Sequence, residues 1–593
     1  MIHLLDYPFD SQLIMKKKKG LKRELLSTAG NFLNKNVAIL GGSTTKDITE
    51  MLELFLLKND IKPTFYESEF GQYWEDAVFD NSSLEVFSPD LFYIHTSNRN
   101  INYYPSPLSS QKEIDQSLLN EFKRFEKMWD SLRQKYGCLI IQNNFELPFF
   151  RILGNLDSVD FRGRTNYILK LNSMFAKYAE HNSDLIINDI NYLSASFGLQ
   201  KWSAPQDWYL YKYSLAISAI PMLSFSVANL IKAAYGKNKK ALILDLDNTL
   251  WGGVIGDDGP EGIELGEESS LGQAYREFQS YIKMHKDIGI LLAINSKNDL
   301  ENAVSGLTHP DGLLRPEDFL VIKANWNNKD TNIREIAHEL NLGADSFVFI
   351  DDNAAERDIV KKSSQGVAAP EIGSVESYIA TIDKAGYFEV IELSDEDVKR
   401  NQMYKVNIER ETVQKEFLDY DEYLLSLEMT ADIKTFDPIY VSRIAQLTNK
   451  TNQFNLTTKR FSQSEIELIM ADDLSIKISG RLSDKFGDHG VTSLVIAKIE
   501  DNVMNIELWL MSCRVLKRNL EFAMMDILVE EALRKEIKSI KGYYIKTPKN
   551  KMVKEFYGSL GFKLVEQEGE NTIWQLELGA YQSLNKVIQV NHY

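Results

Sequence analysis

The sequence predicts a multi-domain α/β protein, and three observations lead to this class. Through much of the chain, short apolar runs that end in polar residues alternate with helix-like stretches, a pattern typical of parallel α/β domains. The last third instead starts helical and then gives several strand-like runs, which indicates an α+β domain with a central sheet. The chain has 593 residues, enough for about three or four domains at roughly 150 residues each.

Two polar breaks divide the chain into three predicted units, 1–236, 237–392 and 393–593. The stretch GKNKK directly precedes an apolar strand and marks the first break. The second break lies near Leu393, where Ser394 followed by Glu396 and Asp397 is typical of a helix start.

The elements of each unit follow from these runs. In the first unit we expect strands at 36–41, 91–98 and 137–144 and a helix at 46–59. In the second unit the strands are expected at 241–247, 291–296, 319–323 and 346–352. In the third they are expected at 475–482, 492–501, 503–512 and 541–548, with a helix over 520–536.

Charge and composition exclude several classes of protein. The net charge of −18 argues against a general nucleic-acid binder, because phosphate contacts need clustered Lys and Arg. Two cysteines exclude a disulfide scaffold and indicate a reducing compartment. The N-terminus does not read as a signal peptide. The uncharged run 213–231 is long enough to span a bilayer, but Pro221, Asn229 and four serines interrupt it, so we expect a buried helix and a cytoplasmic protein without membrane partners.

Polar side chains end the predicted strands of the second unit or lie beside them. Ligands of open parallel sheets gather at the carboxyl ends of the strands. Clustered carboxylates there suit Mg²⁺, a carboxylate beside the ion can attack phosphorus, and a second acid can transfer the proton. A hydroxyl and an ammonium group can hold the phosphoryl oxygens. The residues are Asp245, Asp247, Ser296, Lys329, Asp351 and Asp352.

One DxD motif at a strand end is more often a cap or a turn, but four elements in this order are hard to obtain by chance. The order DLDNT, INS, Lys and FIDDN resembles the haloacid dehalogenase (HAD) phosphohydrolases. The resemblance implies Asp245 as nucleophile and Asp247 as acid and base. The phosphate-binding residues would be Thr249, Ser296 and Lys329, and the Mg²⁺ ligands Asp245, Asp247 through its carbonyl, and Asp352, with Asp351 as a further candidate.

The spacing of these motifs leaves no room for a large cap domain. A Gly-rich flap, 252–266, and one helix separate the first motif from Ser296, and about thirty residues separate Ser296 from Lys329. Such an open site accepts a phosphate displayed on a large partner, unless the neighbouring units form the lid.

The residues within and around these motifs are similar to a narrower group than the HAD phosphohydrolases as a whole. DLDNTLWGGVIGDDG, NSKND, NWNNKDTNI and FIDDNAAERD are similar to the FkbH-like family, subfamily IIIC. Members of that family make glyceryl-acyl carrier protein from 1,3-bisphosphoglycerate, form an enzyme-bound glyceryl thioester and remove its phosphate. The resemblance therefore implies a phosphorylated small acyl substrate and an acyl carrier protein or CoA-type thiol as partner.

The third unit contains HGVTSLVIAK, SCRVLKRNLEFAMM and TPKNKMVKEFYGSLGF, which resemble the GNAT acyltransferase fold. In that fold, the amides of a loop before a helix bind a pantetheine-linked diphosphate, and the loop here would be 514–519. Glycines usual near Lys517 and Asn519 are missing, which argues against conventional acetyl-CoA binding. Candidate carrier or pantetheine contacts are Arg514, Arg518, Asn550 and Tyr557; Tyr557 as a general acid and Tyr557 packed beside Phe556 and Phe562 both stay open.

Cys513 admits two interpretations that the sequence leaves open. It is either a small buried hydrophobic residue or a thiolate nucleophile. In the second case Arg514 and Arg518 would favour the thiolate, and His489 would serve as its base. Asp484 or Asp488 would orient the imidazole ring.

Cys138 lies within a strand pattern and is predicted to be a core residue. A local basic cluster follows Cys513 in the third unit. It is either a solvated helix start or a dock for an acidic carrier protein or a phosphate tail. The cluster consists of Lys546, Lys549, Lys551 and Lys554.

Ser43 follows a strand in VAILGGSTT, which resembles the start of SGNH-type esterases. Such enzymes need a late Asp-x-x-His pair to activate the serine, and none lies between Ser43 and Lys240. His95 and His181 are present but neither has that spacing; His95 ends a strand, a position from which it could face Ser43. A degenerate SGNH/flavodoxin-like domain used for packing or docking is favoured over an active Ser43.

The predicted function is that of an Mg²⁺-dependent phosphatase joined to an acyltransferase-like unit. One alternative is a stand-alone phosphatase for a small metabolite, with the flanking units as lids. The other is a scaffold without enzymatic activity that retains a vestigial site.

Overall fold

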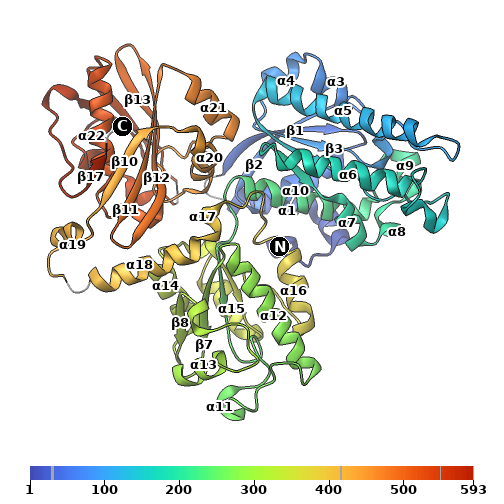
Figure 1. The fold of residues 1–593 in the computed structure, drawn as a ribbon, viewed down its shortest axis with the longest axis horizontal. Helices are drawn as coiled ribbons and strands as arrows, with labels where there is room; N and C mark the ends of the chain where they lie inside the picture. The colour runs from blue at the N-terminus through green and yellow to red at the C-terminus, as the bar shows by residue number, and fades with distance from the viewer. Residues whose placement is uncertain (29–31, 415–416, 548, 592–593) are drawn as a thin grey trace. The chain divides into compact units, whose positions relative to one another are not determined.

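The computed structural model describes residues 1–28, 32–414, 417–547 and 549–591. It confirms the multi-domain α/β class (Figure 1). The chain forms two compact units, Met1–Tyr235 with Arg460–Leu468, and Gly236–Lys459 with Ile469–Tyr593. The range 237–392 and most of the range 393–593 therefore lie within one compact unit, whereas Arg460–Leu468 belongs to the other. The last residues of two predicted ranges, 541–548 and 393–593, are outside the described residues.

The first unit contains a five-stranded parallel sheet in the order β2-β1-β3-β4-β5. Alternate residues of β1 face opposite sides, as a strand requires: Val37 and Ile39 join one core, and Ala38 and Leu40 the other. The strands are β1 (Leu33–Gly41), β2 (Ile61–Glu67), β3 (Leu91–His95), β4 (Leu139–Asn143) and β5 (Leu185–Asn188).

Helices cover both faces of this sheet. One core takes its helical residues mainly from α1, α2 and α10, and the other mainly from α5 and α6. The helices are α1 (Ser11–Thr28), α2 (Lys46–Lys58), α3 (Tyr73–Val78), α4 (Ser82–Phe87), α5 (Gln111–Tyr136), α6 (Arg164–Glu180), α7 (Ile190–Phe197), α8 (Leu199–Trp202), α9 (Pro205–Tyr211) and α10 (Ile220–Ala234).

One described helix is long and apolar enough, by length and composition alone, to cross a membrane. It covers Ile217–Ala234, and 72% of it is buried inside the protein. Leu223, Val227 and Ile231 belong to the core formed with α1 and α2. Packing within the first unit thus accounts for this apolar run.

The second unit begins with a four-stranded parallel sheet in the order β8-β7-β6-β9. Helices α12 and α16 pack on one face and α14 and α15 on the other. The strands are β6 (Ala241–Leu244), β7 (Leu291–Ser296), β8 (Val321–Ala324) and β9 (Phe347–Ile350). The helices are α11 (Ile255–Asp258), α12 (Ser270–Asp287), α13 (Leu300–Leu307), α14 (Lys329–Glu339), α15 (Ala354–Ser363) and α16 (Val375–Lys384).

An eight-stranded mixed sheet follows, in the order β15-β16-β14-β13-β12-β11-β10-β17. The strands are β10 (Thr430–Thr435), β11 (Ser475–Asp484), β12 (Gly487–Glu500), β13 (Val503–Met511), β14 (Ser539–Tyr544), β15 (Lys563–Glu568), β16 (Asn571–Glu577) and β17 (Gln589–Asn591). The helices are α17 (Asp395–Val398), α18 (Arg400–Gln414), α19 (Tyr420–Ser426), α20 (Val441–Lys450), α21 (Gln463–Ala471), α22 (Leu520–Arg534) and α23 (Phe556–Ser559).

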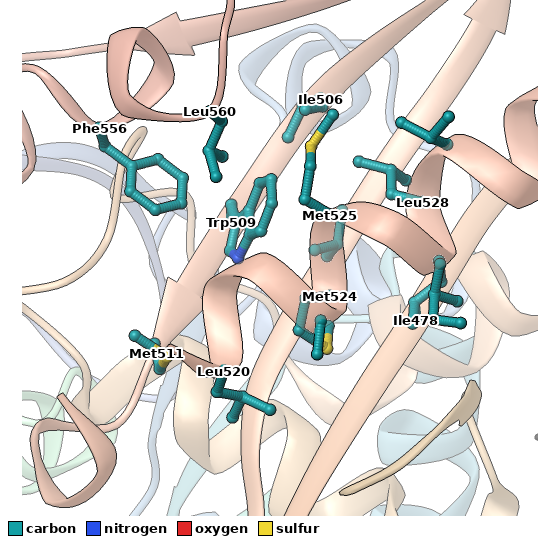
Figure 2. Close-up of a cluster of buried hydrophobic side chains, with 14 of the residues drawn as sticks. Ile478, Ile506, Trp509, Met511, Leu520, Met524, Met525, Leu528, Phe556 and Leu560 are labelled. Atoms are coloured by element: carbon teal, nitrogen blue, oxygen red, sulfur yellow. The ribbon is translucent and has the colours of Figure 1, made fainter. Parts of the chain in front are cut away.

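The core of this sheet forms around α22. Figure 2 shows Met524, Met525 and Leu528 of the helix beside Ile506 and Trp509 of β13. All five side chains are buried. The helix that follows β13 is therefore fixed to the sheet, and with it the loop that carries Cys513.

Strands β13 and β14 pair in parallel only over their first four residues and then diverge. A segment of the chain itself enters between them. The Leu456 amide donates to the Trp509 carbonyl at 3.1 Å, and the Ile545 amide donates to the Leu456 carbonyl at 2.8 Å. Because backbone groups at a parting of strands need partners, this segment leaves little room there for a ligand that binds strand edges.

Candidate active site

The parallel pairing of β6 and β9 brings two acids together. Leu244 is level with Ile350, so Asp245 and Asp351 both emerge at the carboxyl end of the sheet. Carboxylate oxygens of Asp245, Asp351 and Asp352 all lie within 4.8 Å of one another. The expected gathering of acids at this edge is present in the structure.

Lys329, the first residue of α14, lies between two of these acids. Its Nζ is 2.9 Å from Asp245 Oδ2 and 2.5 Å from Asp351 Oδ2. Although burial opposes it, the charges of Asp245 and Asp351 raise the pKa of Lys329. Burial and the nearby charge of Asp245 raise the pKa of Asp351 to about 6. The lysine thus holds together carboxylates that would otherwise repel.

The contacts of Asp351, the further candidate metal ligand, indicate a different role. Its Oδ2 is paired with Lys329, and its Oδ1 accepts a hydrogen bond from the Asn353 amide at 2.8 Å. Asp352 as a whole residue is exposed. Partial desolvation beside the other acids, followed by the charge of Asp245, raises the pKa of its carboxyl group. The arrangement gives Asp351 an anchoring role for Lys329 and leaves Asp352 the freer carboxylate.

The three acids fit a divalent cation. The buried Asp245 Oδ1 has no hydrogen-bond partner among the described residues, which is costly for a carboxylate unless something else binds it. An oxygen of this kind beside two further carboxylates is the donor set that Mg²⁺ prefers. Asp245 and Asp352 would hold the ion.

Asp247 is fixed by three donors. Its Oδ1 accepts from Trp251 Nε1 at 2.9 Å and from the Ile255 amide at 3.1 Å, and its Oδ2 accepts from Asn298 Nδ2 at 3.0 Å. Burial raises the pKa of Asp247. Sequence reasoning missed Asn298 and Trp251; the position of Asn298, two residues after Ser296 in NSKND, was the available signal.

Two hydroxyl groups lie in the same region. Ser296 is the last residue of β7, which pairs directly with β6, and it is buried. Thr249 is fully buried, and its Oγ1 has no hydrogen-bond partner in the described part of the chain. Both hydroxyls belong to the expected set for binding phosphoryl oxygens.

The flap at 252–266 is short, and backbone hydrogen bonds hold its two ends together. Gly252 and Glu264 exchange two backbone hydrogen bonds of 3.0 and 2.8 Å, with the four-residue α11 between them. The Trp251 ring is buried against Gly306, where an added Cβ would lie 2.5 Å from the ring. This flap is too small to cover the acids as a domain would.

Cys513 lies two residues after Met511, the last residue of β13, and is partly exposed. Its Sγ lies 4.0 Å from the Tyr404 hydroxyl. It lines two cavities of about 380 and 370 Å³. The thiol is therefore not a core residue, in contrast to Cys138, whose burial raises the pKa of its thiol.

The structure does not bring His489 to Cys513, which corrects the expectation of a thiol–imidazole pair. His489 Nε2 accepts from Arg518 Nη1 at 2.7 Å, and Asp484 Oδ2 lies 3.2 Å away. Burial lowers the pKa of His489 to about 4. The reason is topological: β12 extends beyond β13 and pairs with β11 there, so His489 faces Asp484 of the hairpin.

Three of the expected carrier contacts also serve the fold. Arg518 is buried and pairs with Asp484 at 3.1 Å. Asn550 is fully buried and donates to the Asn455 and Ile545 carbonyls at 2.9 Å. Tyr557 is fully buried beside Phe556 and Phe562, which agrees with the packing interpretation. Asp488 pairs with Arg481 and does not orient His489.

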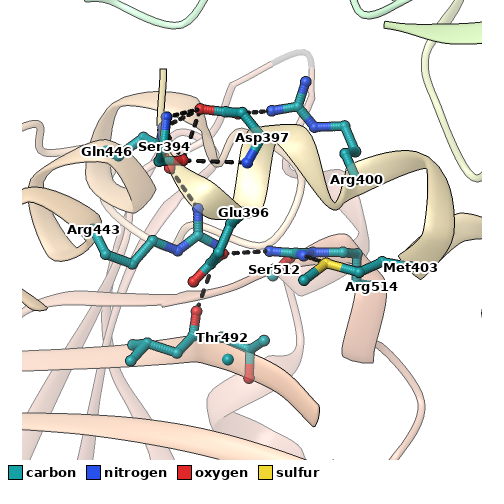
Figure 3. A network of polar contacts seen from close by, with 12 residues as sticks. Ser394, Glu396, Asp397, Arg400, Met403, Arg443, Gln446, Thr492, Ser512 and Arg514 are labelled. Atoms are coloured by element: carbon teal, nitrogen blue, oxygen red, sulfur yellow. Dashed lines mark hydrogen bonds and ion pairs between the residues drawn. The ribbon is translucent and has the colours of Figure 1, made fainter. Parts of the chain in front are cut away.

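The loop before α22 keeps the shape that glycines would give. Lys517 and Asn519 have φ values of +64° and +61°, in the left-handed region. The absence of glycine therefore did not remove this conformation. Arg514, at the start of the loop, pairs with Glu396 at 3.2 Å (Figure 3).

Within the basic cluster, Lys546 pairs with Glu570 and Lys549 with Asp345. Lys551 and Lys554 are exposed. These contacts agree with a solvated surface.

Ser43 and His95 are linked through a second serine. Ser43 Oγ is 3.1 Å from Ser214 Oγ, which is 3.2 Å from His95 Nε2. Asn143 Nδ2 lies 3.0 Å from His95 Nδ1 and 3.2 Å from the Thr96 carbonyl, so it is the donor to Nδ1. Burial lowers the pKa of His95 to about 4. A neutral ring that accepts at Nδ1 carries its proton on Nε2 and cannot take the serine proton.

Comparison with known proteins agrees with this description. Residues 36–232 match the family described as FkbH, N-terminal domain. A crystal structure of the N-terminal part of the protein BF1531 from Bacteroides fragilis, containing a phosphatase domain complexed with Mg, is 28% identical, with a TM-score of 0.59; the match covers 64% of this chain and 99% of that chain. The predicted resemblance to the FkbH-like family is confirmed, and the likeness supports a phosphatase.

Two acetyltransferase structures are also similar to part of the chain. The ribosomal-protein-S18-alanine N-acetyltransferase of Escherichia coli is 11% identical, with a TM-score of 0.20, over 25% of this chain and 94% of that one. The PaiA N-acetyltransferase of Thermoplasma acidophilum, in complex with coenzyme A, is 14% identical, with a TM-score of 0.19. The match covers 25% of this chain and 99% of that chain. Among curated proteins, none matches this chain.

Proposed function

We propose that this FkbH-related chain is an Mg²⁺-dependent phosphohydrolase that removes the phosphate of a phosphorylated acyl group. The observation that carries the proposal is the buried set of Asp245, Asp351 and Lys329 with the exposed Asp352 beside it. The bound Mg²⁺ would neutralise the acids and polarise the phosphoryl group. The protein's own residues carry out the bond-making steps.

In the first step, a carboxylate oxygen of Asp245 attacks phosphorus, and the bond between phosphorus and the substrate oxygen breaks. Asp247 donates its proton to that leaving oxygen, which departs as an alcohol. In the second step, Asp247 takes a proton from water, and the water oxygen attacks the aspartyl-phosphate. Phosphate leaves, and Asp245 is restored.

Other residues place the reacting groups. Lys329, Ser296 and Thr249 would bind the phosphoryl oxygens as negative charge develops on them. Asn298 and Trp251 hold the Asp247 carboxyl in place, and from this position it would protonate the leaving oxygen.

The acyl group is proposed to be small, glyceryl being the case that the family resemblance implies. It would form a thioester with Cys513 when the thiolate attacks the carbonyl of an acyl phosphate and inorganic phosphate leaves with the bonding electrons. The acyl group would then pass to the thiol of an acyl carrier protein or a CoA-type thiol, which displaces the Cys513 thiolate.

The proposed carrier arm would reach Cys513 through a cavity. The cavity of about 370 Å³ is lined by Leu516, Lys517 and Arg518 of the loop before α22 and reaches the thiol. The parting between β13 and β14 is filled by Leu456 and its neighbours, so the arm would enter through this cavity.

Phosphate release from phosphoglyceryl thioesters of a carrier protein and of pantetheine tests the function. The account predicts Mg²⁺-dependent release that Asp245→Asn abolishes and Cys513→Ala preserves, because the substrate already carries its acyl group on a thiol. Equal release by the Asp245→Asn variant would exclude the phosphatase mechanism. If the protein releases phosphate rapidly from one free metabolite and from neither thioester, the stand-alone phosphatase would be favoured.

A further inference from the structure

The cavity of about 380 Å³ beside Cys513 carries an unusual charge. Seven lysine and arginine side chains line it, against three aspartate and glutamate side chains. The whole protein has a net charge of −18, so this local excess of cations runs against the general composition. Cations in a partly enclosed space repel one another unless an anion joins them.

The acids in this cavity are already shared. Glu396 pairs with Arg443 at 2.6 Å and with Arg514 at 3.2 Å (Figure 3). Asp397 pairs with both Arg400 and Lys450. Each of these two carboxylates is thus shared by two cations, the third acid, Asp345, pairs with Lys549, and positive charge remains.

Lys240 adds a further cation to the lining of the cavity. It precedes β6, lines the cavity, and is partly buried. Its ammonium group forms no hydrogen bond or ion pair with any residue that the structure describes. Lys240 and Cys513 both line this cavity, and burial lowers the pKa of Lys240.

Two other cations that line the cavity also have lowered pKa values. Burial and the neighbouring arginines lower the pKa of Lys450 to about 8, although Asp397 is 3.2 Å away. Burial, followed by the charge of Arg514, lowers the pKa of Arg443 to about 10. Protonated side chains that are disfavoured in this way gain stability from a bound anion.

We propose that this cavity is the binding site for the phosphate-bearing end of the acyl donor, with Lys240, Arg400, Arg443 and Arg514 around the phosphate and the Cys513 thiol beside the donor's carbonyl group. The volume suits a small phosphorylated carboxylic acid. The site is separate from the Asp245 acids, so one part of the chain would bind the phosphorylated donor and another would remove phosphate. This inference rests on the proposed function, because that function supplies the donor.

Protection of Cys513 from alkylation tests the site directly. The full-length protein is treated with iodoacetamide, in inorganic phosphate or in chloride of equal ionic strength, and Cys513 alkylation is followed by mass spectrometry. Cys138 is buried and serves as the internal unreactive thiol. Phosphate should slow alkylation about tenfold at about ten times its dissociation constant.

Variants identify where the phosphate binds. Lys240→Met and, as an independent variant, Arg443→Met should each lose most of the protection. Lys554→Met, an exposed lysine outside the cavity, should keep it. Absence of protection in the wild type, or equal protection in both cavity variants, would overturn the proposal.

Asp245→Asn separates this inference from the proposed function. Protection that persists in Asp245→Asn places the phosphate at Cys513, whereas protection lost in that variant assigns it to the acids and overturns the inference. If Asp245→Asn keeps its phosphate release while protection is normal, the proposed phosphatase function fails and the binding site stands.

Discussion

The Lys329 ammonium group lies 2.9 Å from Asp245 Oδ2, and both side chains are almost completely buried. The proposed nucleophile is therefore paired with a cation before any substrate arrives. Because Asp351 shares the same ammonium group, the lysine serves both the fold and the reaction.

Lys329→Met should abolish phosphate release and lower the free energy of unfolding by about 3–5 kcal/mol, because two buried carboxylates lose their partner. The matched control is Lys323→Met, which removes a more exposed lysine that bridges Glu335 and Glu339 and should cost about 1 kcal/mol or less. Urea denaturation and phosphate release measure both effects. Equal destabilisation by the two variants would contradict the account.

Asn298→Ala should lower kcat for phosphate release by about tenfold to a hundredfold and leave KM nearly unchanged, because Asn298 orients Asp247 and does not bind substrate. Trp251→Phe keeps a ring against Gly306 and removes one donor, so its effect should be smaller. Steady-state kinetics separate kcat from KM. A rise in KM alone would assign Asn298 to substrate binding instead.

His489→Asn should leave the rate of Cys513 alkylation unchanged, because the imidazole faces Arg518 and Asp484. Asp484→Asn should destabilise the protein by about 3–5 kcal/mol, because it leaves Arg410 and Arg518 buried without their carboxylate. Alkylation kinetics and thermal unfolding provide the two readouts. Slower alkylation in His489→Asn would restore the thiol–imidazole pair.

Glu146 makes the stability of the first unit depend on pH. The side chain is fully buried, its Oε1 has no partner among the described residues, and burial raises its pKa from 4.5 to about 7. The folded state therefore holds its proton more tightly than the unfolded state does. This contribution is complete below about pH 4.5 and is lost as the pH rises to about 7, a change of about 3 kcal/mol.

Hydrogen exchange of β4 amides at pH 5 and pH 8 measures this change, after correction for the intrinsic exchange rate. The measured quantity is the free energy of opening of β4, compared between the wild type and Glu146→Gln. From pH 5 to pH 8 this comparison should change by about 3 kcal/mol in favour of the variant. A difference that does not vary with pH would show that Glu146 titrates normally.

The local sequence predicted which residues lie at the carboxyl end of the four-stranded sheet β8-β7-β6-β9. Asp245, Ser296 and Asp351 each follow or end an apolar run, and parallel pairing brings such residues to one edge. The sequence likewise predicts a helix start at Ser394, whose side chain caps α17 by accepting from the Asp397 amide. These features depend on a few neighbouring residues, which is why the sequence contains them.

Contacts between distant segments could not be predicted in this way. Strand adjacency suggested a pair of Cys513 and His489, but the longer pairing of β12 with β11 turns the histidine toward Asp484. The cations around Cys513 come from four separate segments between Lys240 and Arg514. No local pattern brings such residues together, so only the folded structure reveals the cavity.

The most direct test of the central claim is a substrate-independent one: ¹⁹F NMR of the full-length protein with Mg²⁺ and beryllium fluoride, which adds to a reactive aspartate as an analogue of aspartyl-phosphate. The account predicts bound fluoride resonances that require Mg²⁺, persist in Cys513→Ala and disappear in Asp245→Asn. Bound resonances that survive in Asp245→Asn, or none in the wild type, would contradict Asp245 as the nucleophile.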